Sequence, residues 1–182
     1  MILRALALAC ALLPAAHAEI RHADPSSGRL EFTATQAGAK FDGSFKRFHV
    51  RLDFDPAHPD HGSLDVTVEA SSIETQDDER DDILRSPDFF WVEKHPQAVF
   101  HATRFERAGG SWRAPGELSI RGVKKTVPVT FTLTAGAGPT VMKGSASLKR
   151  LAFGLGQGDW ASTEWVGDDV DVRFELTLKP VG

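Results

Sequence analysis

Histidines and carboxylates gather at two places in the chain where they could do chemistry. His58 and His61 flank a Pro-Asp pair, which offers half of a metal site. The proline-rich setting is more typical of an exposed turn, so we predict no metal site there. The acidic run from Asp77 to Asp82 lacks the spaced Asp-x-Asp-x-Asp-Gly loop and distal glutamate of a calcium site. A solvated helix start explains this run.

Motifs for catalysis are missing from the sequence. No serine stands in a Gly-x-Ser-x-Gly elbow, and there is no His-Glu-x-x-His. The stretch 154–158, GLGQG, resembles a phosphate loop only in composition, because the spacing and the strand–loop–helix context differ; we expect a flexible loop. A pair of carboxylates that meets only in space leaves no sequence signature. The sequence therefore predicts no enzyme and no cofactor, with a carboxylate-dependent hydrolase as an alternative.

The composition is that of one ordinary folded domain. The chain has 182 residues, 41% hydrophobic and 25% charged. Its 21 basic and 25 acidic residues give a net charge of −4, which argues against binding to nucleic acid through phosphate neutralisation. The only cysteine is Cys10. We therefore expect no disulfide and no cysteine-ligated metal.

The first eighteen residues have the pattern of a secretory signal. A basic start that ends at Arg4 precedes the apolar run Ala5–Leu13, Pro14 and the small-x-small site that ends at Ala18. This apolar run is too short to span a bilayer. We predict a signal peptide over 1–18, one domain over 19–182, and a periplasmic location if the chain is bacterial.

Apolar and polar residues alternate with period two along most of the remaining chain, as in strands with one buried face. About eight such stretches occur, so an antiparallel sheet with one wet side is expected. The inward residues are expected to be Leu30, Phe32 and Ala34; Val50, Leu52 and Phe54; Leu64, Val66 and Val68; Ala98, Phe100 and Ala102; Leu118 and Ile120; Val127, Val129, Phe131 and Leu133; Ala146 and Leu148; and Val170, Val172, Phe174, Leu176 and Leu178.

One segment near residues 76–92 has helical signals. Thr75 precedes an acidic first turn, which predicts a capped helix that ends with Ile83 and Leu84. Ser86-Pro87 predicts a second short helix. Eight one-sided strands close into a barrel or stack as a sandwich. Because many inward residues are small, we favour a barrel that leaves room for one slender ligand.

Several short motifs occur in order along the chain. They are Gly38, Phe41, Gly43, Phe45 and Phe48; Ser72-Ile73-Glu74-Thr75; Arg80-Asp81, Leu84, Ser86, Asp88-Phe89-Phe90, Pro96 and Phe100; residues 116–125, GELSIRGVKK; and Arg150, Phe153-Gly154, Trp160 and residues 166–170, VGDDV. Together these motifs resemble the YceI-like family of exported lipid-binding proteins. The match covers nearly all of the chain after residue 18, and its central part is the most specific. Leu151 and Ala152 depart from the family pattern beside Arg150.

The resemblance implies a lipocalin-like, eight-stranded antiparallel barrel whose long apolar cavity holds a polyisoprenoid lipid, a quinone or a similar amphiphile. It also implies a link with a cytochrome b561-type membrane protein. The hypothesis is then a periplasmic carrier or sequestering protein. A structural or signalling module that acts through a membrane partner is the main alternative. The sequence leaves the oligomeric state and the lipid head group open.

The residues expected to contact the ligand are mostly aromatic. They are Phe41, Phe45, Phe48, Ile83, Leu84, Phe89, Phe90, Phe100, Phe131, Phe153 and Trp160, with Arg80 and Arg150 beside polar groups. Core packing is the alternative for each ring. For Arg80, a local structural pair with Asp81 is the alternative to a head-group contact.

Overall fold

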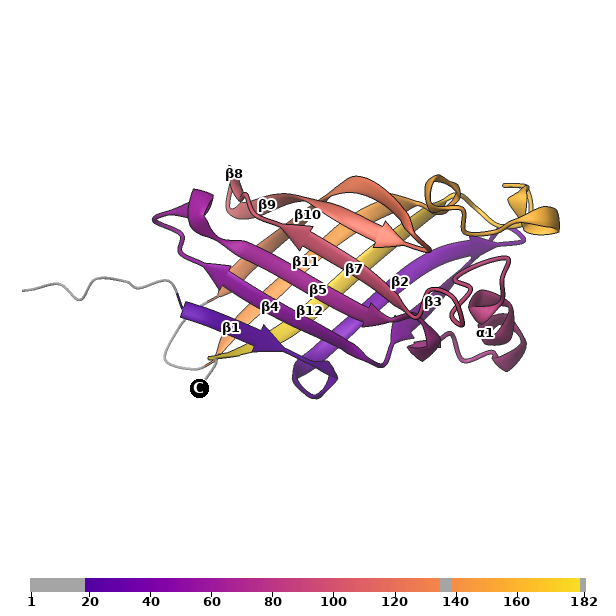
Figure 1. Ribbon diagram of the computed structural model, residues 1–182, viewed down its shortest axis with the longest axis horizontal. Coiled ribbons are helices and arrows are strands. Elements are labelled where there is room, and N and C mark those ends of the chain that lie inside the picture. The colour runs from indigo at the N-terminus through magenta and orange to yellow at the C-terminus, as the bar shows by residue number, and fades with distance from the viewer. Residues whose placement is uncertain (1–18, 135–138, 181–182) are drawn as a thin grey trace, which may run out of the picture.

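The computed structural model describes residues 19–134 and 139–180, which fold into twelve strands and one α-helix (Figure 1). The predicted signal peptide lies outside the described residues. The elements are β1 (Glu19–Ala23), β2 (Gly28–Gln36), β3 (Ala39–Phe45), β4 (Phe48–Phe54), β5 (Ser63–Glu69), β6 (Ile73–Glu74), α1 (Asp78–Arg85), β7 (Gln97–Ala102), β8 (Glu106–Ala108), β9 (Ser111–Ile120), β10 (Val123–Thr134), β11 (Thr140–Lys149) and β12 (Asp169–Pro180).

Eight of these strands form a closed antiparallel barrel, as predicted. The ring runs β1-β4-β5-β7-β9-β10-β11-β12 and closes where β1 pairs with β12, at Arg21 opposite Pro180 and His22 opposite Lys179. The long β9–β10 and β11–β12 ladders build one side of the ring. Closure leaves no free edge among these eight strands.

The wall of the barrel changes along its length. A 3-10 turn at Pro25–Ser27 separates β1 from β2, and both pair with β12: β1 with residues 179–180, β2 with residues 171–176. β3 then pairs with β2, and its far end pairs with β6. One end of the ring is thus closed by β1, whereas the other end is extended by β2, β3 and β6.

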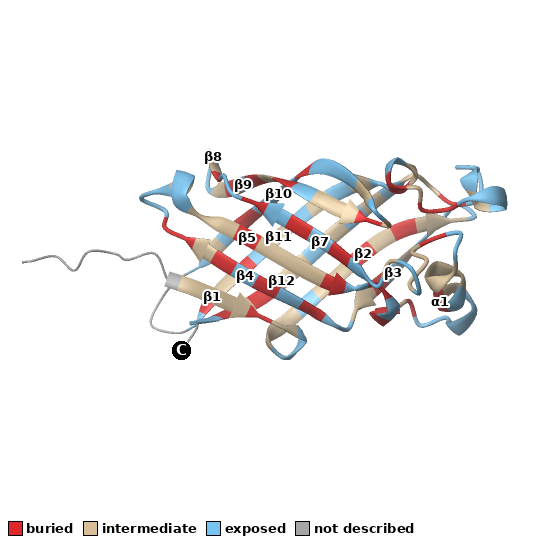
Figure 2. Cartoon of the chain, in the orientation of Figure 1, coloured by how far each residue is buried: buried red, intermediate tan, exposed pale blue. Residues whose placement is uncertain are grey.

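The predicted alternation is confirmed along the strands. In β4 and β7, buried residues alternate with exposed ones or nearly so (Figure 2). The larger of two buried apolar clusters lies inside the barrel and includes Leu52, Leu64 and Leu178, each at most 2% exposed; Phe32, Ala34 and Ile73 form the smaller one. β1, β3, β6 and β8, which were not predicted from alternation, are short or lie at the edges of the ring.

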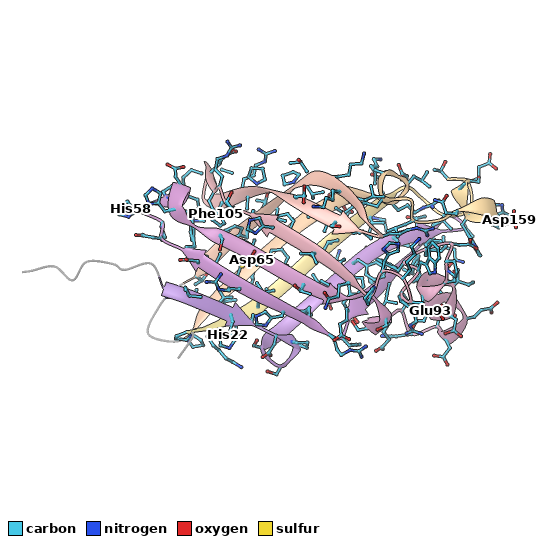
Figure 3. All side chains as sticks on the ribbon, viewed as in Figure 1. His22, His58, Asp65, Glu93, Phe105 and Asp159 are labelled. Atoms are coloured by element: carbon cyan, nitrogen blue, oxygen red, sulfur yellow. The ribbon has the colours of Figure 1, made fainter. Side chains whose placement is uncertain are left out.

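Four aromatic rings fill the end of the barrel that β1 closes. We call Phe54, Phe105, Trp112 and Phe131 the aromatic plug. Phe54 lies 4.5 Å from Phe105 and 4.8 Å from Trp112, measured between ring centroids, and Phe131 lies 6.0 Å from Phe105. Figure 3 places Phe105 at the opposite end from Glu93 and Asp159. We call that opposite end, where α1 and residues 150–168 lie, the cap end.

The predicted helix is present, but its start and its continuation differ from the prediction. Asp77, and not Thr75, caps α1, because its carboxylate accepts the Arg80 backbone N–H at 3.0 Å. The second helix predicted from Ser86-Pro87 is wrong: residues 87–90 form turns that fold back on α1, with Phe90 N–H donating to the Leu84 carbonyl. No helix in residues 19–134 or 139–180 has the length and apolar character to cross a membrane.

Candidate functional site

The barrel encloses a cavity of about 210 Å³ that is lined almost wholly by apolar side chains. All of the barrel strands except β1 contribute to the lining, and so do β2, β3, β6, α1 and the segment 150–168. Of the 31 described residues that line it, 30 are apolar and one, Arg150, is charged. None of the four plug rings lines the cavity. The cavity therefore extends from the middle of the barrel towards the cap end.

Small side chains and half-buried side chains show how the strands leave this space open. Ala34, Ala98 and Ala146, which the sequence predicted to point inward, all line the cavity. Leu118 and Val172 also line it and are only half-buried, although their strand positions point into the barrel. Their remaining exposure is therefore to the cavity and not to the outer solvent.

Two glycines let aromatic rings lie flat against the wall. A Cβ atom at Gly116 would lie 2.3 Å from Cζ of Phe100, and one at Gly43 would lie 2.3 Å from Cζ of Phe32. Real side chains do not approach so closely, so each ring occupies the place where a neighbouring side chain would stand. Phe32 and Phe100 thereby line the cavity without crossing it.

Most of the predicted site residues line the cavity. They are Phe41, Phe45, Phe48, Leu84, Phe89, Phe90, Phe100, Phe153 and Arg150. Two of these rings meet at the cap end, where Phe45 lies 6.0 Å from Phe90 between centroids, and Phe32 lies 5.7 Å from Phe45. The structure brings these residues together, and their contact with a ligand stays a prediction.

Three other predicted residues pack outside the lining. Phe131 is 1% exposed and belongs to the aromatic plug. Trp160 lies behind Phe89, with 5.9 Å between ring centroids. Ile83 packs against the core from α1. Alternation and composition mark such residues as apolar and inward, but they do not say how far along the barrel a residue lies.

Arg80 and Asp81 form no direct ion pair, but both bond to the hydroxyl of Thr75. Arg80 donates to the Thr75 hydroxyl at 2.9 Å and lies over the Phe41 ring, 4.3 Å from its centroid. Asp81 is buried and accepts hydrogen bonds from the backbone N–H and hydroxyl of Thr75 at 2.8 and 2.7 Å. Its nearest cation is Arg85, one helical turn further on, at 3.7 Å. Neighbours one position apart on a helix do not face each other.

Arg150 is 3% exposed, and its guanidinium donates hydrogen bonds to backbone carbonyls. Nε donates to Gly167 at 2.9 Å, Nη1 to Leu155 at 2.8 Å, and Nη2 to Val166 at 2.7 Å. Burial lowers the pKa of this guanidinium, and the charge of Asp168 acts in the opposite sense. Arg150 therefore holds the segment 155–167 against the barrel, with its charge at the edge of an apolar cavity.

Two lining residues come from a segment that has no periodic pattern in the sequence. Leu155 and Val166 lie in the segment that Arg150 holds, and Val166 also forms a bridge with Gln36 at the end of β2. Their inward position depends on hydrogen bonds between distant residues, which no local pattern reveals. As a whole, the site offers an apolar enclosure and one buried cation, which suits binding of an apolar chain.

Comparison with known proteins gives relatives over much of the chain. A UPF0312 protein of Photorhabdus laumondii is 38% identical over 85 residues, which are 47% of this chain and 44% of that protein. A UPF0312 protein of Pseudomonas aeruginosa is 34% identical over 119 residues, 62% of each chain. The aligned part of this chain thus spans between about half and under two thirds of the length of these curated relatives.

Solved structures share the fold. BcnA of Burkholderia cenocepacia is 29% identical, with a TM-score of 0.81 over 86% of this chain and 99% of that one. The Campylobacter jejuni YCEI protein is 28% identical, with a TM-score of 0.63 over 77% and 84%. A polyisoprenoid binding domain from Saccharophagus degradans has a TM-score of 0.70 over 90% and 99%, and at 12% identity it shows the fold alone. The model of the YceI-like domain matches residues 22–178, and the chain therefore belongs to the YceI-like domain family.

Proposed function

We propose that this protein binds one amphiphilic lipid with a long apolar tail, of the isoprenoid or quinone type, and carries or sequesters it without catalysis. The observation that carries the proposal is the cavity, in which 30 of 31 lining residues are apolar. The Saccharophagus degradans neighbour, which is described as a polyisoprenoid binding domain, supports the same class of ligand.

The physical basis of the affinity is burial of the tail. Each methylene-sized unit removed from water contributes about 0.8 kcal/mol. A few isoprene units then offset the roughly 4–15 kcal/mol that association costs. Because the lining offers no set of polar groups to the tail, the walls would select for an apolar chain and not for its chemical detail.

The first test is to purify the protein under mild conditions and to identify any bound lipid by native mass spectrometry and solvent extraction. We expect one isoprenoid lipid or quinone for each protein molecule. A protein that is purified empty and takes up neither quinones nor polyprenols from ethanol would overturn the proposal.

A pair of variants on one strand ties uptake to the cavity. Ala146→Phe on β11 puts a ring into the cavity, whereas Ser145→Phe puts the same ring on the exposed face of the same strand. We expect Ala146→Phe to abolish quinone uptake and Ser145→Phe to leave it unchanged. Equal uptake by both folded variants would place the ligand elsewhere.

The cellular setting belongs to the proposal as well. The pattern of residues 1–18 supports export with cleavage after Ala18, and N-terminal sequencing of the protein from a periplasmic extract tests it. Glu19 as the first residue is the expected result. The link with a cytochrome b561-type membrane protein stays a prediction of the family resemblance.

A further inference from the structure

Trp165 is exposed at the cap end, next in the chain to a residue that lines the cavity, although it is one of the largest apolar side chains. It is 64% exposed, and Val99 is the other large hydrophobic residue on the surface of residues 19–134 and 139–180. Val99 lies on β7, in the outer wall of the barrel. Trp165 instead directly precedes Val166, which lines the cavity. Isolated surface hydrophobics are common, so the position of Trp165 and not its exposure alone gives it meaning.

The backbone beneath Trp165 is fixed from two sides. The Trp165 carbonyl accepts the Ala37 N–H at 2.7 Å, at the turn between β2 and β3. The carbonyl of the next residue, Val166, accepts from Arg150, and Gly167 N–H donates to Thr35 at 2.9 Å. The indole is therefore presented on an ordered rim.

A second tryptophan connects this rim to the cavity. Trp160 is half-buried, lies in the same segment, and contacts Phe89, which is itself a lining residue. Trp160 thus connects to the inside of the barrel through Phe89, and Trp165 does so through its chain neighbour Val166, which lines the cavity. We call Trp160 and Trp165 together the tryptophan rim.

From this arrangement we propose that the tryptophan rim docks the cap end of the barrel on the surface of a lipid bilayer, from which the ligand enters the cavity. This inference rests on the proposed function. An indole suits the boundary between head groups and acyl chains, because its ring is apolar and its N–H donates a hydrogen bond. Docking by the rim would also spare the tail a passage through water, where each exposed methylene is unfavourable.

The charges of the segment that carries both tryptophans indicate the kind of bilayer, and Lys40, which pairs with Thr35 on the neighbouring strand, is a cation close to it. Between Arg150 and Arg173 the chain has no lysine or arginine, whereas Asp159 and Glu164 flank the two tryptophans and are exposed. Figure 3 shows Asp159 at the tip of the cap end. Carboxylates repel an anionic surface and are indifferent to a zwitterionic one. The rim therefore fits a zwitterionic phospholipid surface.

The test is sedimentation of the protein with phosphatidylcholine vesicles, and with vesicles that contain phosphatidylglycerol. We expect partition into phosphatidylcholine vesicles to fall about tenfold in Trp165→Ala, which loses burial of one indole. Val99→Ala removes the other exposed hydrophobic and should bind as the wild type does. Phosphatidylglycerol should weaken binding, and added salt should restore it. Equal partition of Trp165→Ala and wild type would overturn the inference.

A transfer assay separates this inference from the proposed function. A long-chain isoprenoid quinone is offered either within phosphatidylcholine vesicles or from ethanol. We expect Trp165→Ala to extract quinone from vesicles at least several-fold more slowly, yet to bind as much as the wild type from ethanol. If the protein takes up quinone from both sources but does not bind vesicles, the docking inference is refuted and the proposed carrier function stands. If the protein binds vesicles through Trp165 but takes up quinone from neither source, the proposed carrier function is refuted and the docking inference stands.

The Trp165→Ala variant should fold, because the bond to Ala37 is made by the Trp165 backbone. Trp165→Phe should restore part of the vesicle binding.

Discussion

The plug end and the cap end of the barrel are both rich in phenylalanine, but their rings have different surroundings. In the aromatic plug, every ring is at most 7% exposed and packs on another plug ring. At the cap end, Phe41, Phe45 and Phe90 are half-buried and border the cavity. The difference shows that residue type does not decide whether this barrel is filled or hollow.

The strands around the rings decide it. At the plug end the eight strands close through β1, and a ring of eight is just wide enough for side chains to fill it. Towards the cap end β2 and β3 follow, separated from β1 by the turn at Pro25–Ser27, and they extend the wall. The same kind of side chain then lines the space and does not fill it. One end supplies stability, and the other supplies a place for a ligand.

The largest effect that tests this division is expected for Phe131→Ala in the plug. The ring is 1% exposed, and its loss leaves a cavity that the surrounding rings only partly fill. We expect the free energy of unfolding to fall by about 3–5 kcal/mol, measured by urea denaturation. Quinone affinity of the folded variant should stay within about twofold. A loss of stability below about 1 kcal/mol would mean that the plug is not tightly packed.

A smaller effect is expected for Arg150→Met at the cap end. Methionine keeps much of the apolar stem but leaves the carbonyls of Leu155, Val166 and Gly167 without their donor. We expect a loss of about 2–3 kcal/mol, with faster amide hydrogen exchange confined to residues 155–167.

The control for this prediction is Arg173→Met. Arg173 is exposed and its ion pair with Asp42 is on the surface, so its loss should change stability by less than about 0.5 kcal/mol. If Arg150→Met raises amide exchange equally in all strands, residues 155–167 do not unfold separately from the barrel, and the prediction is wrong.

The third prediction repeats the Phe→Ala substitution of the first one, but at the cap end of the barrel. In Phe90→Ala the lost ring borders the cavity, so the folded protein loses little packing. We expect stability to fall by about 1 kcal/mol and quinone affinity to fall about tenfold, measured by fluorescence titration. If Phe90→Ala and Phe131→Ala shift stability and affinity in the same proportion, the two ends do not differ in role.

The walls of the barrel were predictable because alternation is a local property. Phe100 and Phe131 were both predicted to point inward, and both do. The sequence does not distinguish the lining residue from the plug residue, because a position along the barrel depends on the register of strands that are distant in sequence. Both residues were predicted to contact the ligand, but only Phe100 lines the cavity.

The cap was less predictable because its contacts are tertiary. Ser86-Pro87 has the composition of a helix start, yet the backbone N–H groups that follow donate to carbonyls at the end of α1. Arg150 was predicted beside a polar head group, whereas its donors hold carbonyls up to 17 residues away in sequence. Family resemblance identified Arg150 as important, and only the structure shows which groups it contacts.

The smallest predicted effect concerns the pH dependence of the plug end. Asp55 follows β4, and its carboxylate accepts hydrogen bonds from His58 Nδ1 and from the Ala57 N–H, both at 2.8 Å. The His58 bond first, and then the backbone bond, hold the pKa of Asp55 below its ordinary value of 3.8. A carboxyl whose pKa is lower in the folded state stabilises the fold above the unfolded pKa, and this contribution is lost as pH falls through the folded pKa.

Asp55→Asn should therefore be less stable than the wild type near neutral pH, and this difference should shrink as pH falls below 3.8. Asparagine keeps an oxygen for the Ala57 N–H, so the change isolates the charge and its bond to His58. Urea midpoints of both proteins, taken from about pH 6 down to about pH 2.5, provide the measurement. Since the turn lies behind the aromatic plug, quinone affinity should not change at any pH at which both proteins are folded. A difference in urea midpoint that is equally large at both ends of this range would show that the carboxylate stabilises the plug end by packing and not by its charge.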